Sequence, residues 1–193
     1  MSAELIKEIR ELTGAGMMDV KEALGESGGD KDKAIEYLRK KGATKLAKKA
    51  DRVAREGIVE AYIHAGGRIG VLVELNCETD FVARTDDFKN LAKELALHIA
   101  AANPLYVSED QVPNEVIEKE KEIAREQLQG KPENVIEQIL TGKVAKYFEE
   151  TVLLQQPFVK NPDVKVKDHV AISVAKMGEN VVIKRFARFV LGN

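Results

Sequence analysis

The side chains that most often bind metals or act as nucleophiles are few in this sequence and widely separated. The histidines are His64, His98 and His169, and the single cysteine is Cys77. No pair of them has the short spacing of a zinc motif, and one cysteine cannot form an internal disulfide. The sequence therefore predicts no metal site and no cofactor. A lone cysteine, together with the lack of an apolar run typical of a signal peptide, favours a reducing cytoplasm.

Two glycine-containing stretches partly resemble phosphate-binding motifs. Gly14 and Gly16 follow a predicted helix, whereas a dinucleotide fingerprint follows a strand. Gly142 and Lys143 resemble the end of a Walker-type loop, but Glu137 stands where that loop requires its first glycine. Neither stretch predicts nucleotide binding by this chain.

Carboxylates are abundant, but their spacing is that of surface ion pairs. In the stretch EKEKEIARE at 118–126, acidic and basic residues alternate along one predicted helix. Such exposed pairs contribute about a few tenths of a kcal/mol each and are solvated. No convergent acid, base or nucleophile remains, so we predict that the chain is not an enzyme.

The overall charge favours a protein partner over a nucleic acid, and a membrane span is not expected, because no stretch approaches the roughly 18 apolar residues that one needs. The 193 residues are 44% apolar and 32% charged, with a formal net charge of -2. A core can be buried, and no global basic field exists to hold nucleic acid. The run KLAKKADRVAR at 45–55 is locally basic. It is better interpreted as a solvated connector than as a phosphate-binding patch, because it lacks aromatic stacking partners.

One short segment fits neither the strand pattern before it nor the helix pattern after it. It comprises Thr79, Asp80, Phe81 and Val82. A phenylalanine in such a connection commonly tucks under a sheet. Alternatively, Phe81 and Asp80 on a protruding loop would form an apolar wedge beside a negative charge, suited to separating packed helices and disturbing a bound cation. The residues alone leave both interpretations open.

The elements around this segment predict an α+β protein in which a three-helix module precedes a small antiparallel sheet covered by helices. Apolar residues recur at helical spacing over residues 1–42, which Gly42 closes, with Asp30 or Asp32 as a cap of the third helix. Residues 43–56 form the basic linker. Residues 57–193 form the second domain, which contains the segment 79–82 and ends in a strand.

Period-two alternation over residues 58–77 predicts a β-hairpin. A three-residue loop at 65–67 would bury one face of it, placing Ile63 opposite Ile69, Ala61 opposite Val71 and Val59 opposite Val73. Helices are then predicted after the cap Thr85, after Pro113, after Pro132 and over 166–177.

The terminal run VVIKRFARFVL should join the hairpin as a further strand. Its apolar residues occur on both parities, with Ile183 and Phe189 on one and Val182, Phe186 and Val190 on the other. One face would remain exposed on a monomer, so we predict a homodimer.

Four stretches resemble the elongation factor Ts family across essentially the whole chain. They are LTGAGMMDVKEAL at 12–24, ELNCETDFVAR at 74–84, QPFVKNP at 156–162 and GENVVIKRFARFVLG at 178–192. The resemblance implies a ubiquitin-associated-like first module that docks on elongation factor Tu. It also implies a guanine-nucleotide exchange factor that promotes GDP release in the cytoplasm. An adaptor that recognises another protein is the alternative.

The resemblance also assigns residues. Candidate docking contacts are Met17, Met18, Val20 and Lys21, although Met17 and Val20 could instead pack internally. The exchange loop corresponds to Thr79, Asp80, Phe81 and Val82, which would enter between two partner helices, disturb the magnesium site and weaken the hold on GDP. Short members are expected to be homodimers. Longer members carry a second core subdomain and a helical hairpin, and we expect this chain to have room for neither in full.

Overall fold

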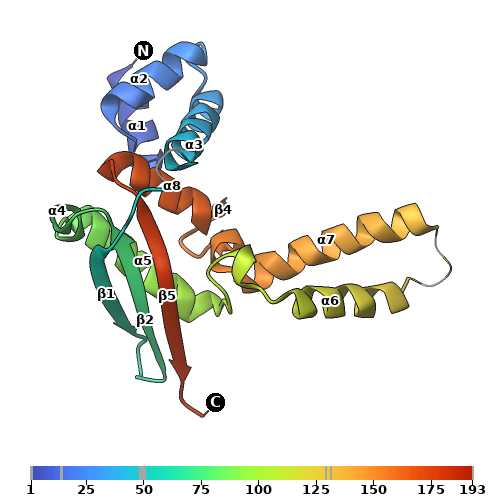
Figure 1. The fold of residues 1–193 in the computed structure, drawn as a ribbon. Helices are drawn as coiled ribbons and strands as arrows, with labels where there is room; N and C mark the ends of the chain where they lie inside the picture. Colours follow the sequence, from blue (N-terminus) through green and yellow to red (C-terminus); the bar gives the residue numbers. More distant parts are fainter. Residues whose placement is uncertain (1, 14, 48–50, 129, 131, 193) are drawn as a thin grey trace. The chain divides into compact units, whose positions relative to one another are not determined.

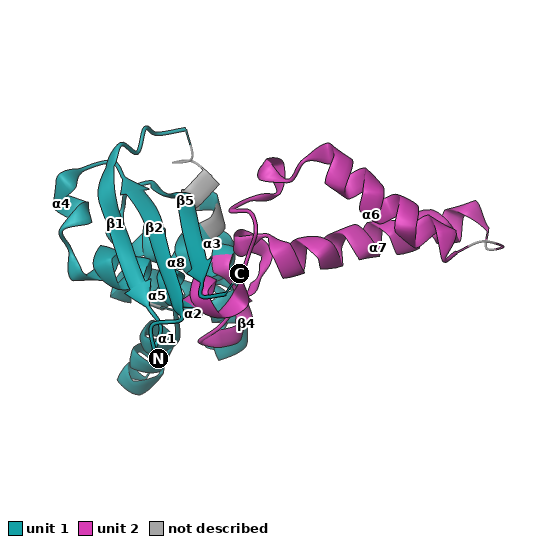
Figure 2. Ribbon diagram, turned by 90° about the horizontal axis from the view of Figure 1, so that it is seen from below, with its two compact units in different colours: residues 1–97, 167–193 teal, residues 98–166 magenta. Residues whose placement is uncertain are grey.

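The computed structural model describes residues 2–13, 15–47, 51–128, 130 and 132–192. Its helices and antiparallel strands follow one another much as the sequence predicts. The α+β class is confirmed, since three N-terminal helices precede a small antiparallel sheet packed with helices (Figure 1). The chain divides into two compact units, residues 1–97 with 167–193 and residues 98–166 (Figure 2). Each is described by itself.

The first unit begins with the predicted three helices, α1 (Ala3–Thr13), α2 (Met17–Glu26) and α3 (Lys31–Ala47). The Asp30 carboxylate accepts a hydrogen bond from the Lys33 amide at 3.0 Å, which confirms the predicted cap. The predicted end at Gly42 is wrong, because α3 continues to Ala47. Gly14 and residues 48–50 of the predicted linker lie outside the described residues. The buried core of the helices comprises Ile9, Val20, Ala23, Leu24, Ala34 and Leu38.

A three-stranded antiparallel sheet follows, with the order β1 (Glu56–Ile63), β2 (Ile69–Cys77), β5 (Val181–Val190). The hairpin and the addition of the terminal strand are confirmed. The predicted register is wrong, because Ile63 pairs with Gly70 rather than with Ile69. The connection spans 64–68 and contains Gly66 and Gly67 at positive φ. A one-residue slip exchanges the two faces of a strand, so Val59 and Ile63 are exposed instead of buried.

A bulge in β5 also changes which of its side chains share a face. Leu75 pairs with Ile183 while Glu74 pairs with Arg185, so Lys184 is the additional residue. Ile183 is consequently buried and Phe189 is exposed, although the sequence parity placed them together. The predicted grouping of these two residues is wrong. The core face of β2 carries Val71, Val73, Leu75 and Cys77.

Helices pack on the core face of the sheet. Between β2 and the long helix α5 (Asp86–Ala102) lies the short helix α4 (Asp80–Ala83). The Thr85 hydroxyl caps α5 by accepting a hydrogen bond from the Phe88 amide at 3.3 Å, as predicted. Phe88, Leu91 and Leu95 form the buried stripe of α5, which lies along the sheet (Figure 1). The helix α8 (Val166–Met177) leads into β5.

The second unit is built around a pair of helices, α6 (Asn114–Glu126) and α7 (Glu133–Thr151). Pro113 and Pro132 stand directly before them. The two helices pack together through Ala124, Ile136 and Leu140. This is a helical hairpin, although no room for a full one was expected from the sequence. The unit also contains short 3-10 turns at Glu109–Gln111 and Leu153–Gln155 and the strands β3 (Pro157–Phe158) and β4 (Asn161–Lys165).

A buried hydrogen-bond network explains the stretch 156–162. The His98 Nδ1 atom accepts from the Val159 amide at 3.1 Å, so the proton lies on Nε2, which donates to the Gln156 side-chain oxygen at 2.9 Å. The Gln156 amide group donates in turn to the Glu150 carbonyl at 2.8 Å. These contacts make His98 and Gln156 structural residues of the second unit.

Gly57 provides a direct test of the β1–β2 packing. Its φ is 148°, and a Cβ atom added there would lie 2.1 Å from the Leu75 carbonyl oxygen. Backbone atoms cannot move aside cheaply, so Gly57→Ala should lower the free energy of unfolding by about 1–3 kcal/mol or more. Thermal unfolding measures this loss.

The control is Gly142→Ala in α7, where an added Cβ meets nothing within 4 Å. Alanine is the better helix former, so this variant should gain about 0.5–1 kcal/mol. A Gly57→Ala protein as stable as the wild type would contradict the observed β1–β2 approach.

Candidate functional site

The segment 79–82 lies between the sheet and α5, and we call residues 79–82 the exchange loop after the role that the family resemblance implies. Thr79 caps the four-residue helix α4, its hydroxyl accepting a hydrogen bond from the Val82 amide at 3.4 Å. The Phe81 side chain is 78% exposed, while Ala83 is buried and anchors the helix. The interpretation in which Phe81 tucks under the sheet is therefore wrong, because the side chain protrudes into solvent.

A charged pair lies beside this exposed phenylalanine. The Asp80 carboxylate accepts a hydrogen bond from the Arg84 guanidinium at 2.7 Å, one helical turn away. Both side chains are largely solvated, so the pair contributes little stability and its charges remain available to a partner. The loop thus presents one apolar ring next to a negative charge.

Sequence patterns gave no indication of Glu179, which holds the base of the loop. Its carboxylate accepts hydrogen bonds from the Glu78 amide at 3.1 Å, the Thr79 amide at 3.0 Å and the Thr79 hydroxyl at 2.6 Å. In the opposite direction, the Glu78 carboxylate accepts a hydrogen bond from the backbone amide of Asn180 at 2.6 Å. The only available signal was the position of Glu179 after the turn glycine Gly178, and this signal specifies no partner.

Cys77 precedes the loop and is a structural thiol. Burial, reinforced by the negative charge of Glu179, raises the pKa of Cys77 to about 11. The thiol donates to the Thr79 carbonyl at 3.1 Å. Cys77 therefore stays protonated at neutral pH and is a poor nucleophile.

The proposed docking residues fall into two groups on α2. Met17 and Met18 are 49% and 75% exposed, and Lys21 is also on the surface. Val20 is fully buried in the three-helix core, because it occupies the inward face of the helix. Val20 therefore packs internally and is not a surface contact. Leu12 on α1 is also exposed, although it was not among the docking contacts predicted from the sequence.

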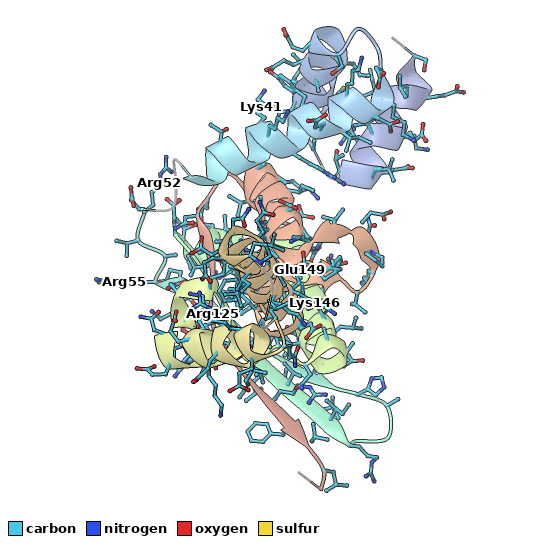
Figure 3. The ribbon with its side chains drawn as sticks, turned by 90° about the vertical axis from the view of Figure 1, so that its right-hand side faces the viewer. Lys41, Arg52, Arg55, Arg125, Lys146 and Glu149 are labelled. Carbon is cyan, nitrogen blue, oxygen red and sulfur yellow. The ribbon has the colours of Figure 1, made fainter. Side chains whose placement is uncertain are left out.

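A polar network supports α2 from α3. The Lys41 ammonium, labelled in Figure 3, lies 2.6 Å from Glu22 and 2.9 Å from Asp19, and the Tyr37 hydroxyl donates to Glu22 at 2.8 Å. The hydrogen bonds to Glu22 and Asp19 raise the pKa of Lys41. The hydrogen bond from Lys41 lowers the pKa of Glu22. The network fixes α2, which carries the exposed methionines.

The residues that the structure describes contain neither a metal-binding cluster nor a membrane-spanning helix. No group of His, Cys, Asp and Glu side chains in that part of the chain could hold a metal ion. The other two histidines have protein partners, His64 with Tyr62 at 3.0 Å and His169 with Glu94 at 2.8 Å. No described helix combines the length and apolarity that crossing a membrane requires.

Comparison with known proteins decides the family. The model of the family described as "Elongation factor TS" matches residues 4–193. The chain belongs to the elongation factor Ts family. Curated proteins named elongation factor Ts match it over its whole length. They include those of Carboxydothermus hydrogenoformans (59% identical, 89% of that protein covered), Heliobacterium modesticaldum (58%, 90%) and Caldanaerobacter subterraneus (58%, 97%). As an elongation factor Ts, the chain is a translation elongation factor.

Proposed function

We propose that this member of the elongation factor Ts family is a guanine-nucleotide exchange factor that binds elongation factor Tu in its GDP form and accelerates GDP release. The observation that carries the proposal is the exchange loop, where an exposed phenylalanine lies next to a carboxylate on a short, anchored helix. A ring that is 78% exposed contributes little to its own fold and can insert into a partner.

The exchange mechanism is non-covalent. Phe81 would enter between two helices of the partner, and Asp80 would alter the surroundings of its magnesium ion. Magnesium and GDP would then leave more readily. By thermodynamic reciprocity, a factor that weakens GDP binding must bind the empty partner more tightly than the GDP-loaded one. The chain hydrolyses nothing, and GTP refills the site in the cytoplasm.

Docking would be the task of the N-terminal helices. Met17 and Met18 expose flexible apolar side chains on α2, and Lys21 adds a positive charge on the same helix. Methionines are common at protein interfaces because they adapt their shape to the partner. We place the initial contact with the partner on this surface.

A direct assay tests the proposal. Purified elongation factor Tu is loaded with a fluorescent GDP analogue, and its release is followed in excess GDP with and without this chain. We expect acceleration that saturates with chain concentration. An unchanged release rate would remove the exchange function and favour an adaptor role instead.

We also propose that the chain forms a homodimer through the outer face of its sheet. Val59, Ile63, Leu72 and Phe189 lie together on that face and are all exposed. Pairing this face with the same face of a second copy would bury the patch and cover an otherwise exposed sheet.

Phe189→Asp should therefore shift the protein toward the monomer. We expect the dimer dissociation constant to rise about tenfold or more, because both copies contribute Phe189 to a symmetric interface and both rings are lost. Light scattering over a concentration series measures this shift. Leu105→Asp is the control, since Leu105 is similarly exposed but lies in the second unit. A wild-type protein that is monomeric at micromolar concentration would eliminate the dimer.

A further inference from the structure

We propose that Glu179 is the positioning residue of the exchange loop. It fixes the start of α4 against the terminal segment, so that Phe81 and Asp80 meet the partner in one orientation. The inference rests on the proposed exchange function and assigns to it a residue outside the loop.

Three donors converge on the one Glu179 carboxylate. The Glu78 and Thr79 amides share one oxygen, at 3.1 and 3.0 Å, and the Thr79 hydroxyl uses the other, at 2.6 Å. The β2–β5 ladder ends at Cys77, so these two amides follow the last strand pair. Because both carboxylate oxygens are engaged, the two peptide groups and the Thr79 side chain are fixed together. Hydrogen bonds to a charged acceptor are stronger than neutral ones.

The Thr79 hydroxyl transmits this constraint to α4. A hydroxyl has one proton, and here that proton points to Glu179. Its lone pairs are then directed to the Val82 amide, which donates to the Thr79 oxygen at 3.4 Å. Glu179 thereby orients the cap from which α4 begins.

The short helix depends on this cap because it is too short to be stable alone. It comprises four residues, Asp80–Ala83, whereas isolated helices need more than about 12 residues in water. Its other anchors include packing against β1 and β2, the buried Ala83, and the Thr79 carbonyl, which accepts from the Ala83 amide at 3.3 Å. Loss of Glu179 would therefore leave the first residues of α4, Asp80 and Phe81, less firmly held in one orientation.

A reciprocal contact makes the brace rigid. The Glu78 carboxylate accepts from the Asn180 amide at 2.6 Å, and the Arg52 guanidinium lies 3.5 Å from the same carboxylate oxygen. The Asn180 side chain donates to the Arg52 carbonyl at 2.8 Å. Residues 78–79 and 179–180 are thus linked in both directions, across a separation of about one hundred residues along the sequence.

The test compares Glu179→Ala and Glu179→Gln in the full chain, with elongation factor Tu carrying the fluorescent GDP analogue. Both the maximal release rate and the half-saturating concentration are measured. We expect Glu179→Ala to lower the maximal rate about tenfold, because the insertion step loses its preorganised loop. The half-saturating concentration should change less than about twofold, because the docking surface on α2 is intact. Glu179→Gln keeps one acceptor oxygen, so its maximal release rate should lie between those of Glu179→Ala and the wild type.

The matched control is Glu149→Ala. Glu149, labelled in Figure 3, lies on α7 in the second unit and accepts a hydrogen bond from Lys165 at 2.7 Å. This variant also loses a hydrogen-bonded surface carboxylate, and it should exchange at the wild-type rate.

Two further measurements separate positioning from other roles. In a double-mutant cycle, Thr79→Val and Glu179→Ala should not be additive, because both break the same link. Additive losses would show that Glu179 acts independently of Thr79 and would overturn the proposal. A wild-type maximal rate in both Glu179 variants would also overturn it.

Amide exchange of the free chain distinguishes failure of this inference from failure of the proposed function. The Glu78 and Thr79 amides should exchange faster in Glu179→Ala than in the wild type, whatever the chain does to GDP release. If the wild-type chain does not accelerate release, the exchange function fails, and these amides still test the brace. Unchanged protection of both amides would overturn the brace itself.

Discussion

Replacing Phe81 with alanine should slow stimulated GDP release about thirtyfold at sub-saturating factor, while leaving the melting temperature nearly unchanged. The ring is 78% exposed, so truncation removes little buried area from the fold. In the complex, the same ring would fill a partner site as a hot spot of about 2 kcal/mol or more. The two effects are separable because they arise in different states of the protein.

Phe88 provides the matched control for this prediction. It lies one heptad after Phe81 and is fully buried in the stripe of α5. Phe88→Ala should cost about 3–5 kcal/mol of stability, and the molecules that remain folded should exchange GDP normally. If Phe81→Ala instead unfolds the chain while its folded fraction retains normal exchange, the exchange loop is wrongly assigned.

Asp80→Ala should slow release less than Phe81→Ala does. Its carboxylate pairs with Arg84 on the surface, so its removal also leaves an unpaired positive charge at the loop. If Asp80 acts on the partner's magnesium site, its effect should shrink when magnesium is chelated. The Phe81 effect should persist under the same condition.

The sequence was sufficient for elements whose signals are local. Asp30 and Thr85 are caps that can be recognised from residue type and position, because each accepts a hydrogen bond from the first turn of its own helix. The apolar stripe of α5 has helical spacing and is buried as predicted. Helix α3 continued beyond the predicted end because Gly42 lies inside it with helical backbone, and a glycine lowers helix stability without forbidding the helix.

The faces of the sheet could not be predicted with the same certainty because they depend on single-residue counts. Ile63 pairs with Gly70 instead of Ile69, so one more residue lies between the paired positions than was assumed, and the pairing moved by one position. The bulge at Lys184 reversed the parity of the remaining part of β5. Both changes alter which side chains face solvent without changing the alternating pattern itself.

The candidate site shows the same division between local and distant information. Residue types identified Asp80 and Phe81 as unusual, but only the fold shows that the ring points outward. Glu179 lies about one hundred residues away along the chain, and its hydrogen bonds form only because β5 is the neighbour of β2. Sequence periodicity contains no information on such a contact.

The second prediction of a large effect concerns the docking surface on α2. Changing both Met17 and Met18 to alanine should raise the half-saturating concentration for GDP release about thirtyfold, while the maximal rate stays near the wild-type value. The two side chains are exposed on α2, so their loss should remove contact with the partner and leave the three-helix core intact. This is the opposite kinetic result from that expected for Glu179.

Val20 is the internal control because it lies on the same helix and points inward. Val20→Ala removes buried methyl groups and should destabilise the N-terminal helices by about 2 kcal/mol, which circular dichroism and thermal unfolding would detect. The double methionine variant should melt as the wild type does. If it releases GDP with an unchanged half-saturating concentration, α2 does not dock on the partner, and the initial contact must lie elsewhere on the chain.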